Sequence, residues 1–125
     1  MAKYLQYGRK IMQVDDIRAF VPSKNYQQSQ AFYKAFGFEL TSVSDTLCLC
    51  ESGECGFFLQ DFYQPQLANN LMLQLSVLDI DEVYSQQRRL NDFNVKYSDI
   101  TQKPWGKEFS LWGPAGELWQ IIEFI

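Results

Sequence analysis

The side chains that most often carry out chemistry in enzymes are sparse in this sequence. Its 125 residues contain no histidine, which excludes a histidine-based triad, an imidazole general base and an imidazole metal ligand. Cys48, Cys50 and Cys55 cluster in one short segment, but no fourth thiolate or imidazole exists to complete a zinc site. The sequence also lacks a glycine-rich phosphate loop and a nucleophile elbow. These absences exclude several catalytic chemistries at once.

The three cysteines have a simpler interpretation as inert thiols. Strand alternation places Cys48 and Cys50 on one face of a sheet, and a turn at 52–54 would bring Cys50 opposite Cys55. A labile disulfide or a redox sensor is the alternative. An odd, clustered set of cysteines is not the framework of a secreted protein, so we expect a reducing, cytoplasmic compartment.

The overall composition limits the partners. Eleven basic and fifteen acidic residues give a net charge of −4, and no run of Lys or Arg occurs, so we expect neither nucleic acid nor an anionic membrane as a partner. No apolar run approaches the roughly 20 residues that span a bilayer. A chain of this length with 46% hydrophobic and 16% aromatic residues is expected to form one compact domain.

The first half of the chain predicts a strand, a helix and three further strands. Residues 15–21 have a strand-like pattern, and Asn25 with Gln28 has the spacing of a helix-capping box. The helix is expected to end before Gly37, where a positive φ is easily adopted. Three runs at 38–43, 46–51 and 56–62 are rich in aromatic and β-branched residues and are separated by short turns.

The second half repeats this order of elements. A strand at 71–78 is followed by the cap pair Asp79 and Glu82, a helix that ends at Asn94, and strands at 95–100, 107–112 and 118–124. A shift of 57 residues aligns Phe36 with Phe93 and the surrounding elements with one another. We therefore predict an α+β fold of two tandem βαβββ modules, about 14–63 and 70–125, whose curved mixed sheet surrounds a groove. Residues 64–70 are the linker, and residues 1–13 form an N-terminal extension outside the single domain.

Two stretches of the sequence resemble a known family. They are Phe20-Val21-Pro22 with the following 31–38, and the closing segments 104–111 and 113–119. These stretches look like the glyoxalase/bleomycin-resistance/dioxygenase superfamily, which has the vicinal oxygen chelate fold. Gly113 stands where that family usually has Asp. The resemblance implies that the tandem modules enclose a groove for a small ligand.

Enzymes of this superfamily hold a divalent metal through four strands, and those positions fall at or near Arg18, Gln60, Met72 and Gln120. A guanidinium cannot coordinate a cation, a thioether is a poor ligand for hard cations, and two neutral amides supply little charge. We therefore expect no metal and no cofactor. The resemblance then implies the bleomycin-resistance branch, whose members are homodimers that sequester a planar, often cationic antibiotic without changing it.

Strand alternation assigns the faces of the last two strands. If Gln120 points into the groove, Trp119 and Ile121 pack against the helices, and Glu108 and Ser110 point into the groove. Aromatic rings would stack on a planar ligand, and Glu108 is the candidate anion for a cation. The predicted ligand-binding residues are Arg18, Phe58, Gln60, Phe62, Met72, Gln74, Trp105, Glu108, Ser110, Trp112 and Gln120.

Two other functions remain compatible with the sequence. One is a lyase or dioxygenase-type enzyme of the same superfamily with an atypical metal site built from Gln60, Gln120 and a glutamate, or with no metal and Glu108 as base. The other is a domain that only mediates protein contacts. Metal content distinguishes the enzyme from the binder, and a groove filled by the protein's own side chains would favour the third function.

Overall fold

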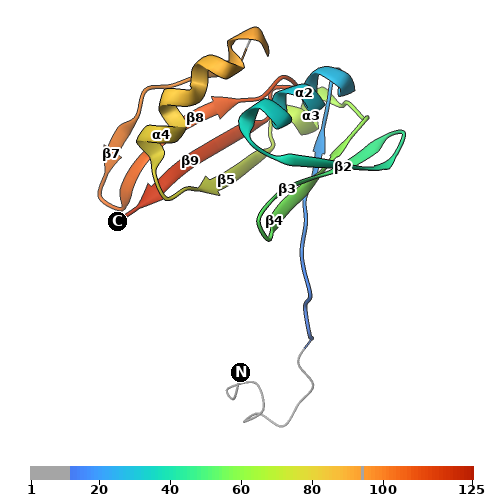
Figure 1. Cartoon of the computed structure of the whole chain (residues 1–125), viewed down its shortest axis with the longest axis horizontal. Helices are drawn as coiled ribbons and strands as arrows, with labels where there is room; N and C mark the ends of the chain where they lie inside the picture. The colour runs from blue at the N-terminus through green and yellow to red at the C-terminus, as the bar shows by residue number, and fades with distance from the viewer. Residues whose placement is uncertain (1–11, 94) are drawn as a thin grey trace.

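The computed structural model of the chain describes residues 12–93 and 95–125, which form two modules (Figure 1). Each module has one mixed sheet with its helix on one face, as the repeat predicts. Most of the predicted extension at 1–13 and the predicted helix end at Asn94 lie outside the described residues. The α+β class and the tandem βαβββ order are confirmed.

The first module forms a four-stranded sheet in the order β1-β4-β3-β2, with β1 and β4 parallel. The Asn25 side chain accepts a hydrogen bond from the backbone N–H of Gln28 at 3.0 Å, and Gly37 ends the helix with φ 125°, so both predicted helix ends are confirmed. The elements are β1 (Phe20–Pro22), α2 (Tyr26–Phe36), β2 (Glu39–Ser44), β3 (Leu47–Ser52) and β4 (Cys55–Gln60).

The second module forms a sheet in the order β5-β9-β8-β6, and β7 also pairs with β8. The side chain of Asp79 caps its helix by accepting the N–H of Glu82 at 3.2 Å, as predicted. A short helix, α3 (Pro65–Ala68), occupies the linker. The other elements are β5 (Met72–Ser76), α4 (Ile80–Ser85), the 3₁₀ helix η1 (Gln86–Phe93), β6 (Lys96–Tyr97), β7 (Thr101–Lys103), β8 (Gly106–Trp112) and β9 (Leu118–Phe124).

Three predicted elements differ from the structure. The first strand begins at Phe20 rather than at residue 15, because only three residues pair with β4. The second helix changes to 3₁₀ geometry at Gln86, in a segment that contains the weak helix formers Asn91 and Asp92. Only residues 96–97 of the strand predicted at 95–100 form a strand, β6, because the side chain of Ser98 takes the N–H of Ser110 away from the regular ladder. A separate strand, β7, begins at Thr101.

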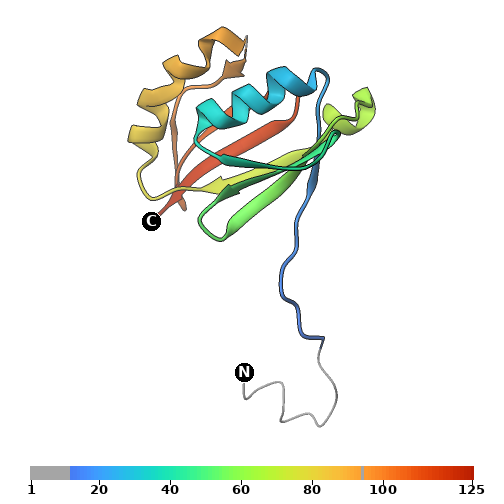
Figure 2. The ribbon, with the colours of Figure 1, turned by 45° about the vertical axis from the view of Figure 1, so that its right-hand side comes forward.

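The hydrophobic core lies between the sheets and their helices, where α2 and η1 also pack against each other (Figure 2). Phe32 of α2 contacts Phe93 of η1 edge to face, with ring centroids 5.8 Å apart. Trp119 of β9 packs against Tyr33, Phe36 and other rings of the first module. The two modules therefore share one aromatic core.

Residues 12–17 run away from the domain as an extended arm (Figures 1 and 2). Met12, Val14 and Ile17 on this arm are exposed. Within the described residues, no helix is both long and apolar enough to cross a membrane.

Candidate ligand-binding face

The candidate site lies on the far face of each sheet, which we define as the face opposite its helix. In the second module, Phe109, Leu111, Trp119 and Ile121 are buried on the helix side. Their neighbours in the strands point to the far face, so the predicted alternation is correct. Cross-strand pairs on that face are Glu108 with Ile122, Ser110 with Gln120, Gln120 with Gln74, Trp112 with Leu118 and Leu118 with Met72.

Three side chains on this far face form a polar row. The Nε2 of Gln120 donates to Oε2 of Glu108, and the Oγ of Ser110 donates to Oε1 of Gln120, both at 2.9 Å. Gln120 therefore holds its amide between an anion and a hydroxyl. The three residues are partly exposed, so a ligand that covers the sheet can reach them.

The electrostatics around Glu108 differ from the sequence-based expectation. Lys103 places its Nζ 3.9 Å from Oε1 of Glu108, and the Nζ of Lys96 lies 4.7 Å from the ring centroid of Trp112. Two lysines thus lie on the same face as the single carboxylate of the polar row, and Glu108 is not an isolated anion. The Nζ atoms of Lys103 and Lys96 offset part of the negative charge of Glu108 on this face.

The far face of the first sheet is more aromatic and apolar. Phe20 stacks on Phe58 with ring centroids 4.9 Å apart, and Gln60 lies two residues further along β4, on the same face. Arg18 is held by Asp16 and by Glu51 on β3. The hydrogen bond from Arg18 lowers the pKa of Asp16, and the same contact raises the pKa of Arg18.

The predicted aromatic residues do not all come together. Trp105 lies in the turn before β8, whereas Trp112 is the last residue of β8, and the strand between them is about 20 Å long at roughly 3.3 Å per residue. Phe58 and Phe62 belong to the other module, where Phe62 follows β4 and is about half exposed. One small ligand cannot contact all four rings, so the predicted list spans more than one contact area.

The four positions that the family resemblance assigned to metal ligands do not form a metal site. Arg18 lies beside Gly56, and Gln60 is four residues further along the same strand, about 13 Å away at the usual strand rise. Met72 pairs with Leu118, whereas Gln120 is already committed to Ser110 and Glu108. Within 12–93 and 95–125, no three Cys, Asp or Glu side chains converge as metal ligands. The donors present do not match a divalent metal.

A buried polar network that the sequence did not reveal joins the two modules. Tyr33 of α2 donates its hydroxyl to Oε2 of Glu117 at 2.6 Å, and the indole N–H of Trp119 donates to the same hydroxyl at 2.9 Å. The backbone N–H of Ala115 donates to Oε1 of Glu117 at 2.9 Å. Glu117 is fully buried, and burial raises its pKa while these donors oppose the rise.

Gly113 makes room for this buried carboxylate. A Cβ at Gly113 would lie 2.6 Å from Cδ of Glu117 and 2.7 and 2.8 Å from its two oxygens. The family to which the sequence is similar usually has Asp at this position. Glu117 fills the space that a side chain at position 113 would need, so the buried carboxylate requires glycine there.

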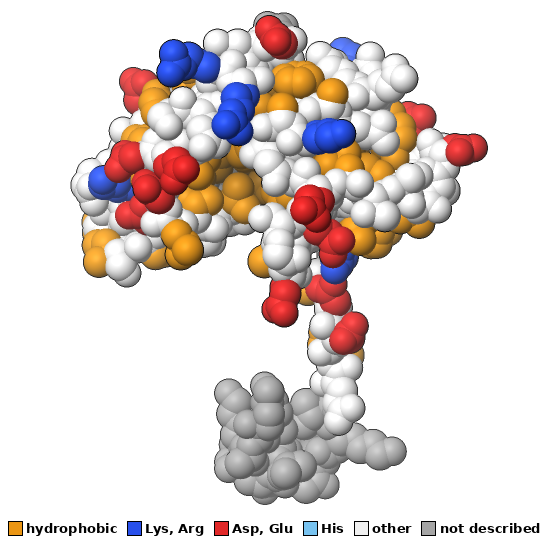
Figure 3. Space-filling view, in the orientation of Figure 1, with side chains coloured by type: hydrophobic (Ala, Val, Ile, Leu, Met, Phe, Trp, Pro, Cys, Tyr) orange, Lys and Arg blue, Asp and Glu red, His pale blue; other side chains and the backbone are white. Residues whose placement is uncertain are grey.

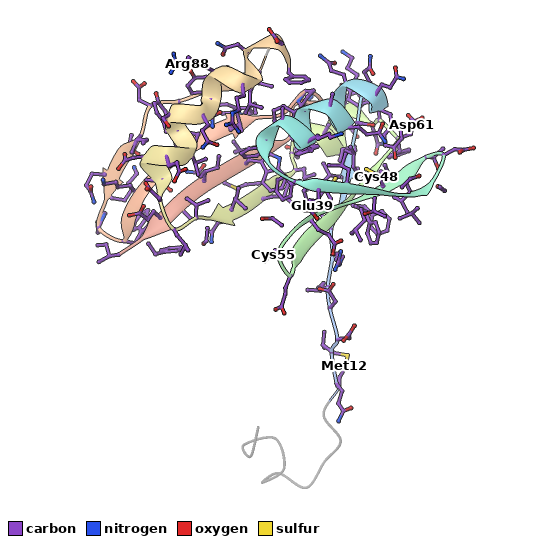
Figure 4. All side chains as sticks on the ribbon, in the orientation of Figure 1. Met12, Glu39, Cys48, Cys55, Asp61 and Arg88 are labelled. Carbon is purple, nitrogen blue, oxygen red and sulfur yellow. The ribbon has the colours of Figure 1, made fainter. Side chains whose placement is uncertain are left out.

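The cysteines are placed nearly as predicted (Figure 4). Cys48 and Cys50 are buried on the helix side of β3 with their sulfurs 3.9 Å apart, and burial raises the pKa of the Cys50 thiol. The predictions that Cys55 is buried and lies opposite Cys50 are wrong: Cys55 is exposed at the tip of the hairpin and pairs with Ser52, because the turn there is shorter than expected. All three thiols are free.

Two cavities lie where the modules meet. The larger, about 400 Å³, is on the helix side, between the end of α2 and α4–η1, and it is visible as a hollow among hydrophobic side chains in Figure 3. The smaller, about 140 Å³, lies near the start of β4 and along β5. Of the predicted site residues, only Gln74 lines either cavity. The polar row itself lies on an open surface.

Comparison with solved structures identifies the fold. The chain is similar to a bleomycin resistance determinant encoded on the transposon Tn5, with 20% identity, a TM-score of 0.72, and 89% of this chain and 98% of that chain covered. It is also similar to an antibiotic-binding protein from Streptomyces sp. CB03234, with 18% identity, a TM-score of 0.74, and 92% and 100% coverage. A lactoylglutathione lyase from Agrobacterium tumefaciens matches with 17% identity, a TM-score of 0.65, and 89% and 95% coverage.

These similarities show the vicinal oxygen chelate fold, as the sequence predicted. Both binding proteins and an enzyme share this fold, so the fold does not by itself decide between them. No family model matches the chain, and no curated protein does.

Proposed function

We propose that this protein binds a planar organic molecule, of the kind exemplified by flat antibiotics, without changing it chemically. The observation that supports this function best is the polar row of Glu108, Gln120 and Ser110 on an open sheet face. Hydrogen-bonding groups on such a face orient a ligand, while the neighbouring Trp112 ring supplies a stacking surface. The solved structures of similar fold include a bleomycin-binding protein complexed with bleomycin.

The binding-competent form that we propose is a homodimer. The far face leaves Phe20 and Met72 exposed at 50% and 62% of their surfaces, and the arm presents Ile17 at 89%. A single chain leaves this face open, whereas a second copy laid against it would bury these side chains and enclose the ligand. The groove expected from the sequence is then formed between two chains.

The charge of the ligand is the least specified property. A net charge of −4 favours a cation at long range, but Lys103 and Lys96 beside the polar row offset part of the local negative charge. We propose a planar ligand with hydrogen-bonding groups, for which a positive charge is not required. The three free thiols support a cytoplasmic location, and the acidic chain without a basic run supports neither nucleic acid nor a membrane as partner.

Calorimetric titration with metal-free bleomycin and with a planar aromatic antibiotic tests the proposal. We expect a dissociation constant below about 1 mM for at least one probe, with quenching of tryptophan fluorescence. Gln120→Ala should weaken binding about tenfold, because the variant loses both contacts of the central amide. Gln66→Ala, at an exposed position on α3, is the matched control and should bind like the wild type.

Two results would overturn the proposal. One is the absence of binding by every planar probe at millimolar concentration. The other is a stoichiometric content of nickel, iron, manganese or zinc in protein purified without chelator, which would support the enzyme alternative. Sedimentation of the free and ligand-saturated protein tests the dimer separately, since a monomer that binds ligand would contradict only that part.

A further inference from the structure

The larger cavity has the properties of a second, independent binding site. Its volume of about 400 Å³ lies within the range of roughly 300–1,000 Å³ that is typical of small-molecule sites. Its walls come from both modules and consist of residues 35–38, 52, 75–78, 83, 86, 87 and 90.

None of the residues that line this cavity is charged. The walls include the rings of Phe36 and Phe38, which meet edge to face at 5.7 Å, and the aliphatic side chains of Leu75, Val83 and Leu90. Arg88 on η1 is exposed at the outer surface of the molecule (Figure 4) and does not line the cavity. An ion would find no counter-charge in these walls, so the chemistry of the lining selects a neutral, mainly apolar molecule.

One polar group in the wall lacks a partner. Gln87 is 3% exposed, and its Nε2 donates to the backbone carbonyl of Val83 at 3.0 Å. Its Oε1 is buried with no hydrogen-bond partner among the described residues. Buried amide oxygens in folded proteins are nearly always hydrogen-bonded, because an unpaired one forfeits its hydration. Gln87 lines the cavity, so a small rotation of its side chain would present this acceptor to a donor bound there.

We propose that this cavity binds a neutral aromatic molecule that carries one hydroxyl or N–H donor, and that the donor bonds to Oε1 of Gln87. The rings of Phe36 and Phe38 provide the apolar contact, and the amide provides direction. The site is separate from the polar row, because its walls face the helices while Glu108, Ser110 and Gln120 lie on the far face. The proposal consequently stands or falls independently of the function assigned to that face.

A matched pair of probes tests this site. The hydroxyl compound 2-naphthol and its ether 2-methoxynaphthalene have nearly the same shape, but only the first donates a hydrogen bond. We expect wild-type protein to bind 2-naphthol in the micromolar range by calorimetry and to bind the ether about fivefold more weakly. The chemical shifts of residues in the cavity wall should move in the nuclear magnetic resonance spectrum.

Three variants separate the contribution of the Gln87 acceptor from that of the apolar walls. Gln87→Leu should bind both probes equally, since the acceptor is gone and the apolar walls remain. Ala35→Phe should reduce the binding of both at least tenfold by filling the cavity. Gln66→Ala, at an exposed position on α3 that does not line the cavity, should leave both affinities unchanged.

Circular dichroism and tryptophan emission confirm that each variant is folded before titration, and Ala35→Phe retains a decisive readout if Gln87→Leu does not fold. Equal binding of the two probes by the wild type would overturn the role of Gln87. No binding of either probe, or full binding by Ala35→Phe, would overturn the site itself.

Discussion

Glu117 and Glu108 are two glutamates on opposite sides of the second module, and their surroundings differ sharply. Glu117 lies on the helix side, is fully buried, and accepts hydrogen bonds from the Tyr33 hydroxyl and from a backbone N–H. Glu108 lies on the far face, where its partners Gln120 and Lys103 are themselves partly exposed. The same side chain thus occurs in a closed and in an open environment.

The difference shows which polar groups stabilise the fold and which are available to a ligand. The partners of Glu117 belong to α2 and to the turn before β9, so breaking the network disturbs the contact between modules. Hydrogen bonds to a buried charge contribute about 1.5–3 kcal/mol each. The contacts of Glu108 exchange easily with water, and a ligand can replace them at little cost to the fold.

Gly113→Asp should have the largest effect on stability, because it places a second carboxylate in the space that Glu117 occupies. Steric overlap and like-charge repulsion in a buried site should lower the free energy of unfolding by about 4 kcal/mol or more. A typical domain has only about 5–15 kcal/mol of stability, so much of the variant would be unfolded at room temperature. Urea unfolding followed by tryptophan fluorescence measures the loss.

The double variant Gly113→Asp with Glu117→Asn tests the cause. Shortening the side chain at position 117 and removing its charge makes room for the carboxylate introduced at position 113, so we expect recovery of at least about 2 kcal/mol relative to Gly113→Asp alone. Glu117→Asn by itself should be destabilised, since Tyr33 and Ala115 lose an ideal acceptor. Additive losses in the double variant would contradict the shared-space explanation.

Much of the fold follows from local signals in the sequence. Asn25 with Gln28 and Asp79 with Glu82 predict the two helix starts, and strand alternation correctly places Trp119 on the helix side and Gln120 on the far face. The sequence pattern did not predict that the strand is interrupted at Ser98. A serine side chain that accepts a hydrogen bond in place of the strand backbone leaves no periodic pattern in the sequence.

The site was predicted less completely than the fold. Composition and alternation place Glu108, Ser110 and Gln120 on one face, but neither predicts that Lys103 approaches Glu108. The Glu117 network joins residues 84 positions apart in the chain, so only the packing of the modules reveals it. In the sequence, a buried glutamate in a glycine-rich turn looks like an ordinary surface residue.

Titration of the buried Glu117 should make the stability of the protein depend on pH. Burial raises the pKa of Glu117 above its ordinary value of 4.5, so the folded state holds this proton more tightly than the unfolded state does. The free energy of unfolding should therefore fall as pH increases from about 4.5 through the native pKa of Glu117. Below about pH 4.5, the contribution of protonated Glu117 to the free energy of unfolding is fully present.

Glu117→Gln isolates this contribution. Glutamine is similar in shape but does not titrate, so the difference in stability between the wild type and the variant should change with pH over that window. A difference that is constant between pH 4 and pH 8 would contradict a raised pKa. Gln66→Ala, an exposed substitution on α3 that changes no titratable group, is the control and should keep the pH profile of the wild type.

The smallest effect on stability is expected for Ser110→Ala. Ser110 donates one hydrogen bond to Gln120 on a partly exposed face, and water can replace the hydroxyl, so the free energy of unfolding should change by less than about 1 kcal/mol. Affinity for a planar ligand should nevertheless fall severalfold in the calorimetric titration, because the freed oxygen of Gln120 no longer has a fixed orientation. A large loss of stability without a loss of affinity would reverse the comparison and make the polar row a structural element like the Glu117 network.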